Sequence, residues 1–163
     1  MKKTILLKAL PIFLLICWML VIFLLSAQKA VESSNLSDGI VFKVVNIFYS
    51  DFDNLSKPQQ IELLQRISHF VRKTAHFLEY FILGALAFWV ATMFERIKLF
   101  GQSVIAFAIC VVYAVSDEIH QYFVPGRACR FGDVLIDSFG SFLAIIIIAV
   151  LIKNLKKLGE NHA

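Results

Sequence analysis

Residues 134–152 read VLIDSFGSFLAIIIIAVLI, an apolar run close to the ~20 residues that an α-helix needs to cross a ~30 Å hydrocarbon core. Three further runs of the same character occupy residues 10–27, 75–94 and 99–116. Backbone polar groups in lipid must hydrogen-bond to one another, so each run is predicted to be a helix. The sequence therefore predicts an all-α, polytopic membrane protein with four transmembrane helices, forming a single domain over residues 1–163.

The composition supports this prediction. The chain is 59% hydrophobic and 17% charged, whereas soluble domains are about half apolar and about a quarter charged. Such a chain is too hydrophobic to be disordered. Its net charge of +4 comes from basic residues that flank the apolar runs, so membrane topology explains them and we expect no nucleic-acid partner. The three cysteines form no CxxC pair, which gives no indication of a zinc site or a disulfide framework.

Basic residues gather at three places that lie on one side of the predicted bundle. They are Lys2, Lys3 and Lys8 before the first helix, Arg96 and Lys98 between the second and third, and Lys153, Lys156 and Lys157 after the fourth. The positive-inside rule assigns this side to the cytoplasm, so both termini of a multi-pass cell-membrane protein are expected there. We interpret the first run as an uncleaved helix because it is long for a signal peptide and no small-x-small cleavage site follows it.

The outer segment between the first two helices contains two shorter patterns. Residues 40–48 are apolar but too few to span a membrane. Ser56 is a candidate N-cap with Pro58 in the first helical turn. Apolar residues then recur at helical spacing, namely Ile61, Leu64, Ile67 and Val71. We expect two amphipathic helices lying on the outer leaflet, the second continuing into the second transmembrane helix.

Polar and ionisable residues gather where the predicted helices meet the outer face. They are Arg72, His76, Glu79, Asp117, His120, Gln121, Arg127, Asp133 and Asp137. Helical spacing places the first three on one face and the next three on another. The Pro125-Gly126 turn should direct Arg127 back over the membrane surface. Because charge inside a membrane is costly, these side chains are predicted to share a pocket. Small residues at 140, 141 and 144 should let a neighbouring helix approach closely.

Three functions fit such a cluster. In an enzyme, His120 and His76 would be acid–base groups oriented by Asp117 and Glu79. Arg127 and Arg72 would clamp a phosphate, with Gln121, Asp133 and Asp137 as further binding residues. In a binding protein, the same groups would hold the headgroup of a membrane lipid or lipid-linked precursor, or a glycopeptide, without turnover.

The third possibility is packing alone. In that case Arg127 pairs with Asp133 or Asp137, and Arg72 pairs with Asp117 or Glu118.

The sequence does not set the oligomeric state. No zincin motif is present, and we expect no metal and no cofactor. Lys73, Glu118 and Arg130 are expected to be solvated, and His69 to lie on the surface.

Three motifs in this region, together with Leu25-Ser26-Ala27-Gln28, resemble the VanZ-like membrane protein family. They are Arg72-Lys73-x-x-His76-Phe77-x-Glu79-Tyr80, Asp117-Glu118-x-His120-Gln121-x-Phe123-x-Pro125-Gly126-Arg127, and Asp133-x-x-x-Asp137-x-x-Gly140. One departure is the stretch Gly140-Ser141-Phe142-Leu143-Ala144, where relatives often carry a second glycine. The resemblance implies a role in the cell envelope and, for some members, an association with antibiotic resistance, namely low-level resistance to teicoplanin. It implies no particular reaction and no catalytic residue.

Overall fold

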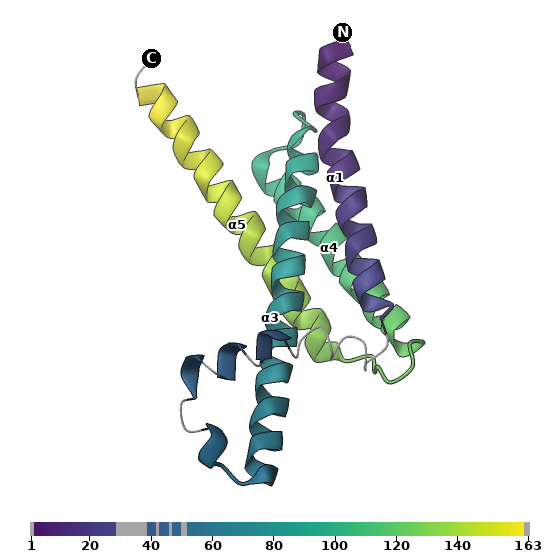
Figure 1. The fold of residues 1–163 in the computed structure, drawn as a ribbon. Coiled ribbons are helices and arrows are strands. Elements are labelled where there is room, and N and C mark those ends of the chain that lie inside the picture. The colour runs from purple at the N-terminus through teal and green to yellow at the C-terminus, as the bar shows by residue number, and fades with distance from the viewer. Residues whose placement is uncertain (1, 29–38, 42, 46, 50–51, 162–163) are drawn as a thin grey trace.

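The computed structural model describes residues 2–28, 39–41, 43–45, 47–49 and 52–161, and no strand occurs among them. Its helices are α1 (Lys2–Ser26), the short 3-10 helix η1 (Phe52–Asn54), α3 (Lys57–Thr92), α4 (Leu99–Tyr122) and α5 (Phe131–Asn161). Within these ranges α1, α3, α4 and α5 are long and apolar enough to cross a membrane, as the sequence predicts. The helix α1 begins and α5 ends at one end of the bundle, called here the termini end (Figure 1). At the opposite end, the loop end, α1 and α4 finish and α5 begins.

The long helices extend beyond most of the boundaries that the apolar runs predicted. The helix α4 continues to Tyr122, beyond the predicted run over residues 99–116, and the connection to α5 comprises residues 123–130. Hydropathy marks the part of a helix that meets lipid, whereas its backbone hydrogen bonds continue wherever the side chains permit. Asp117, His120 and Gln121 are therefore carried on a helix rather than on a loop.

The segment before the second span is helical at residues 39–41, 43–45 and 47–48, and it packs against the first half of α3 as a helical hairpin. The second predicted amphipathic helix continues into the span as expected, because α3 is one helix of 36 residues. The backbone N–H of Ser56, its N-cap, donates to Oε1 of Gln59 at 3.0 Å, and Pro58 lies in the first turn. A continuous helix cannot both cross a membrane and lie flat on it, so the first half of α3 would project from the membrane where its second half crosses it.

A small apolar cluster explains the amphipathic pattern of the hairpin. Val41 and Val45 pack against Ile67 of α3, and all three are buried. The apolar stripe of the first half of α3 is therefore covered by protein, at least at Ile67. Figure 1 shows this hairpin extending past the loop end of the bundle.

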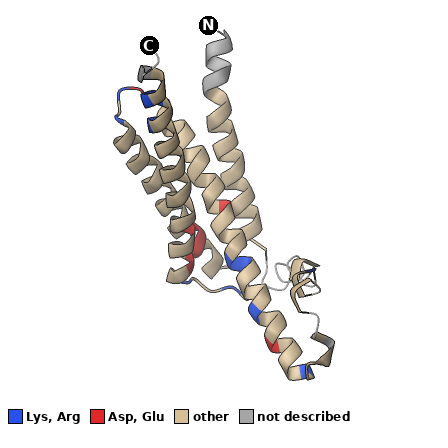
Figure 2. Cartoon of the chain, turned by 90° about the vertical axis from the view of Figure 1, so that its left-hand side faces the viewer, with Lys and Arg blue, Asp and Glu red and all other residues tan. Residues whose placement is uncertain are grey.

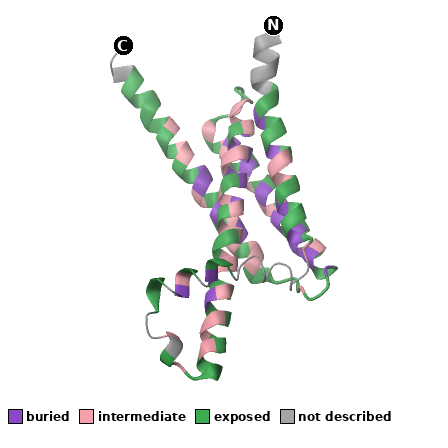
Figure 3. Ribbon diagram, in the orientation of Figure 1, coloured by how far each residue is buried: buried purple, intermediate pink, exposed green. Residues whose placement is uncertain are grey.

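The main core lies between the four long helices, with α3 in contact with each of the others. Tyr80, Leu83 and Phe88 of α3 are fully buried, and Cys110 of α4 and Ile145 of α5 pack in the same cluster. Figure 3 shows buried positions facing between the helices and exposed positions facing outward. The exposed outer faces carry many large apolar residues, which is the distribution that a lipid-facing surface requires.

The helices α3 and α5 cross with their backbones in contact. A Cβ atom added to Gly84 would lie 2.6 Å from the carbonyl oxygen of Ser141, and one added to Gly140 would overlap the carbonyl oxygen of Phe77. The predicted close approach at 140 and 141 is therefore confirmed, although position 141 is a serine. Only glycine at 84 and 140 allows this crossing.

Candidate functional site

A hydrogen-bonded chain of polar side chains joins α1 to α4 at the loop end. The Ser26 hydroxyl donates to Oδ2 of Asp117 at 2.7 Å, and the Gln121 amide donates to the same oxygen at 3.1 Å. Nη1 of Arg127 donates to Oε1 of Gln121 at 3.3 Å. Asp117 and Gln121 are buried one helical turn apart, as their spacing predicts. This chain fixes the end of α1 against α4.

The Pro-Gly turn returns Arg127 to the end of α1, as the sequence predicts. Gly126 has a φ of 80°, a conformation that glycine adopts without strain. Nε of Arg127 donates to the carbonyl oxygen of Gln28 at 2.9 Å, and Nη2 donates to that of Leu25 at 3.4 Å. Burial, followed by the charge of Arg72, lowers the pKa of Arg127 from its ordinary value. A guanidinium nevertheless stays protonated in proteins. Its positive charge therefore lies at the C-terminus of α1, where the helix dipole is negative.

Acidic and basic groups face one another where α3 crosses α5. Lys73 and Asp133 form an ion pair whose side chains are 21% and 14% exposed. Nδ1 of His76 lies 3.8 Å from Oε2 of Glu79 and 3.9 Å from Oδ1 of Asp137. These two distances are close approaches rather than hydrogen bonds. Glu79 lines a cavity, whereas Asp137 is fully buried. The imidazole of His76 is therefore close to one carboxyl group at the cavity and to another in the interior.

Several pairings differ from the packing alternative that the sequence allowed. Asp133 pairs with Lys73 rather than with Arg127, and Lys73 is only partly exposed. Arg127 instead donates to the oxygens of Gln28, Leu25 and Gln121. Composition and spacing cannot select among such partners, because the partners come from separate helices.

Glu118 was expected to be solvated, and this expectation is wrong. Only 1% of the residue is exposed, and its Oε2 accepts a hydrogen bond from the backbone N–H of Arg130 at 2.8 Å. Arg130 immediately precedes α5, so this carboxyl holds the start of α5 against the end of α4. Arg130 itself is exposed, as is His69, and both expectations are confirmed.

Two adjoining cavities lie among these residues. The first, about 180 Å³, has a mostly apolar surface, although polar and charged residues also line it: Leu25, Ser26, Gln28, Ile40, Val71, Arg72, Ala75, His76, Glu79 and Arg127. The second, about 220 Å³, is mostly polar and is lined by His69, Arg72, Lys73, His76, Gln121, Gly126, Arg127, Ala128, Arg130 and Asp133. We call them the apolar lobe and the polar lobe. Arg72, His76 and Arg127 line both lobes and so stand at the junction.

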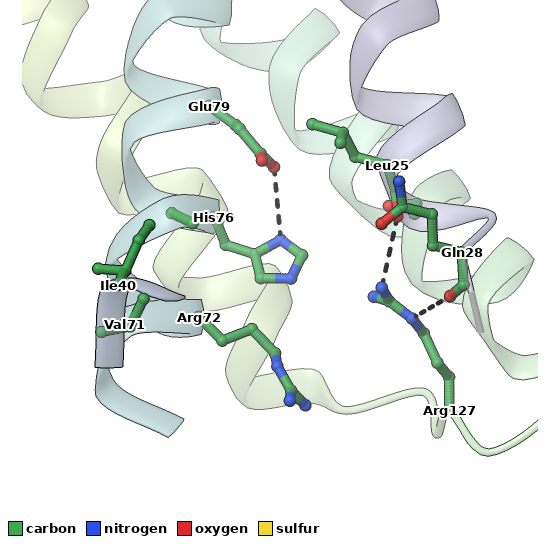
Figure 4. Close-up of a pocket in the computed structure, with 10 residues that line it drawn as sticks. Leu25, Gln28, Ile40, Val71, Arg72, His76, Glu79 and Arg127 are labelled. Atoms are coloured by element: carbon green, nitrogen blue, oxygen red, sulfur yellow. Dashed lines mark hydrogen bonds and ion pairs between the residues drawn. The ribbon is translucent and has the colours of Figure 1, made fainter. Parts of the chain in front are cut away.

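Figure 4 shows how the junction is arranged. The imidazole of His76 lies with one nitrogen toward Glu79, and its opposite edge faces the side on which the Arg72 and Arg127 guanidinium groups lie. Arg127 comes from the loop on the far side of the lobe and points back across it. The face shared by Arg72, His76 and Glu79 thus lines one cavity, as their spacing predicts.

Some of the remaining predicted residues line this pocket, and others lie near it but outside its lining. Gln121 and Asp133 line the polar lobe. Asp117 and Asp137 are buried behind it, and the lining of neither lobe includes them. His120 packs its ring on Phe23 of α1, with centroids 4.5 Å apart, and the lobes do not include it either.

Most residues of the site could be predicted from the sequence, but Tyr80 was recognised only as part of a motif. Its hydroxyl is fully buried and accepts or donates no hydrogen bond among the described residues. The feature of the sequence that could have indicated Tyr80 was its position, one residue after Glu79 in an otherwise apolar span. Figure 2 shows acidic residues gathered in the bundle near the loop end. Over the part of the chain that is described, no three His, Cys, Asp or Glu side chains are grouped as metal ligands.

Comparison with known proteins identifies the family of this chain. No curated protein and no solved structure gives a significant match. The family profile VanZ/LLP1, however, matches residues 11–153. That range includes every residue that lines the two lobes. The chain is therefore a multi-pass membrane protein that belongs to the VanZ/LLP1 family.

Proposed function

We propose that the two lobes bind the anionic headgroup of a lipid-linked cell-envelope precursor. The observation that carries this proposal is the junction, where Arg72, His76 and Arg127 line both an apolar and a polar cavity. An amphiphile with a phosphate between a hydrocarbon chain and a sugar has the same order of parts. Its chain would lie in the apolar lobe, its phosphate at the junction and its sugar in the polar lobe.

The chemistry of the junction suits a phosphate or pyrophosphate. A guanidinium presents a planar fork of N–H donors that matches two phosphate oxygens. Arg127 uses three of these donors for Gln28, Leu25 and Gln121, so two of its five N–H groups remain for a ligand. The protein contacts also hold the guanidinium in place, which lowers the entropic cost of binding.

We also propose that the loop end faces the exterior, where it would meet such precursors. Arg96, Lys98, Lys153, Lys156 and Lys157 lie toward the termini end, and the positive-inside rule assigns that end to the cytoplasm. We further propose that binding of the precursor underlies the effect on teicoplanin susceptibility that the family resemblance implies.

Cys129 tests this orientation directly. It lies exposed in the connection between α4 and α5, whereas Cys17 and Cys110 lie within spans and are less accessible. A membrane-impermeant maleimide added to intact cells should label the protein, and Cys129→Ser should abolish the labelling. Labelling that requires permeabilised cells would contradict the proposed orientation.

The binding proposal is tested with the full-length protein in lipid nanodiscs and a polyprenyl pyrophosphate as ligand. We expect Arg72→Gln and His76→Gln each to weaken binding roughly ten-fold, the equivalent of one charge-assisted hydrogen bond. Arg66→Gln is the control, because Arg66 lies on the same helix in an exposed pair with Glu62. Equal losses in all three variants, or none, would contradict the proposal. Disappearance of the site variants from the membrane would instead indicate a packing role.

The position of His76 supports a second candidate, an enzyme acting on the same ligand. Its Nδ1 faces Glu79 and Asp137, which would orient the ring and leave the other nitrogen toward the junction. In hydrolysis, His76 would accept a proton from a water molecule as the water oxygen attacks phosphorus, and would return that proton to the departing phosphate oxygen. Release of inorganic phosphate from the bound pyrophosphate would favour this candidate, and its retention intact would favour binding alone.

A further inference from the structure

A third cavity lies at the termini end, remote from the polar cluster. It has a volume of about 330 Å³ and opens between α4 and α5, where Figure 1 shows α5 diverging from the other helices. Its walls are mostly apolar and include Phe100, Val104, Phe107, Phe142, Ile146 and Val150. We call it the α4–α5 groove.

The polarity of the α4–α5 groove is confined to one end. Ser103 lines it, but its hydroxyl donates to the carbonyl oxygen of Leu99 at 3.0 Å and so remains within the helix. Phe107 and Phe142 meet edge to face, with centroids 5.7 Å apart, and make an aromatic part of the wall. Lys153 is the charged residue among the lining residues, and it is exposed. The groove therefore has a hydrocarbon body and a cationic mouth.

Further positive charge surrounds this mouth. Lys98 is the N-cap of α4, and the next two residues, Leu99 and Phe100, line the groove. The first N–H groups of a helix lack internal partners and carry partial positive charge. Figure 2 shows basic residues at the end of α5 and in the link between α3 and α4. An occupant with a negative group at this level gains chiefly from Lys153, the cation that lines the groove.

We propose that the α4–α5 groove binds an anionic phospholipid, with one acyl chain along the apolar wall and the phosphate at Lys153. Charge complementarity selects this occupant over a second copy of the chain. Two copies in one membrane share the same orientation, so pairing through this groove would bring two basic termini ends together. An anionic lipid brings the opposite charge, and its acyl chain is as apolar as the walls.

Native mass spectrometry of the full-length protein, with bound phosphatidylglycerol or phosphatidylcholine, tests the proposal. We expect retention of phosphatidylglycerol to exceed that of phosphatidylcholine, and Lys153→Gln to reduce it about five-fold, the effect of one cation near a headgroup. Lys157→Gln is the control, because Lys157 lies one turn further along α5, is exposed and does not line the groove. It should leave retention nearly unchanged.

A second variant tests the apolar part of the groove. Ala149 lines it, and Ala149→Phe should fill it and reduce the retention of both lipids. Equal losses in Lys153→Gln and Lys157→Gln would overturn the proposal, because diffuse charge would then explain the preference. A dimer that Ala149→Phe dissociates, with lipid retention unchanged, would assign the groove to a second copy and would also overturn it.

Discussion

Replacing Gly140 by alanine is expected to lower the free energy of unfolding by roughly 3 kcal/mol, the upper part of the range for overpacked interiors. The added Cβ would overlap the carbonyl oxygen of Phe77, which is backbone and cannot rotate away. The helices α3 and α5 would have to separate along their crossing, and the nearby His76 and Asp137 would separate with them. Thermal unfolding of the purified protein in a defined detergent measures the effect.

Gly132 provides the matched control within the same helix. A Cβ added there would have no atom within 4 Å. Gly132→Ala therefore removes the same backbone conformational freedom of glycine without a clash. We expect it to be neutral or slightly stabilising, because alanine is a better helix former than glycine. Equal destabilisation by the two substitutions would show that backbone contact between α3 and α5 is not what position 140 requires.

Arg127→Ala should have the largest effect on ligand binding. The substitution removes two donors toward the ligand, each worth about 1.5 kcal/mol or more, so we expect affinity for a polyprenyl pyrophosphate to fall roughly 100-fold. It also leaves the carbonyl oxygens of Gln28 and Leu25 without this donor, so the free energy of unfolding should fall as well. Titration in nanodiscs measures the first effect, and unfolding without ligand measures the second.

Arg127→Lys separates the two roles of this side chain. Lysine keeps the positive charge but loses the planar fork, so we expect binding to recover only in part while α1 loses its contacts at both carbonyls. Arg66→Ala, on the exposed face of α3, should change neither quantity. Full binding by Arg127→Ala would contradict a ligand role for this residue even if the protein were destabilised.

The convergence of the site could be predicted from the sequence because it follows from helix number and helical spacing. Arg72, His76 and Glu79 recur at intervals of four and three residues, and the structure brings all three to one cavity. Asp117 and Gln121, one turn apart, are joined by a hydrogen bond. These relations lie within single helices, where the 3.6-residue repeat determines geometry.

Relations between helices could not be predicted in the same way. Glu118 points away from Asp117 on the helical wheel, yet it is buried, because α4 contacts α1, α3 and α5 and so has neighbours on more than one face. His120 and Asp117 share a face, as their spacing predicts, and both contact α1, Asp117 through Ser26 and His120 through Phe23. The spacing within α4 does not identify α1 as the partner, because Phe23 lies 97 residues earlier in the chain. The apolar stripe around Ile67 would look the same whether it faced lipid or the hairpin that covers it.

The unbroken course of α3 has a mechanical consequence. At about 1.5 Å per residue, its 36 residues make a rod of about 54 Å, well beyond the ~30 Å of the hydrocarbon core. No break in the helix separates the first half of α3 from the second half, which carries His76 and Glu79. A sideways force on the first half of α3 would therefore also tilt His76 and Glu79, which line the pocket from the same helix.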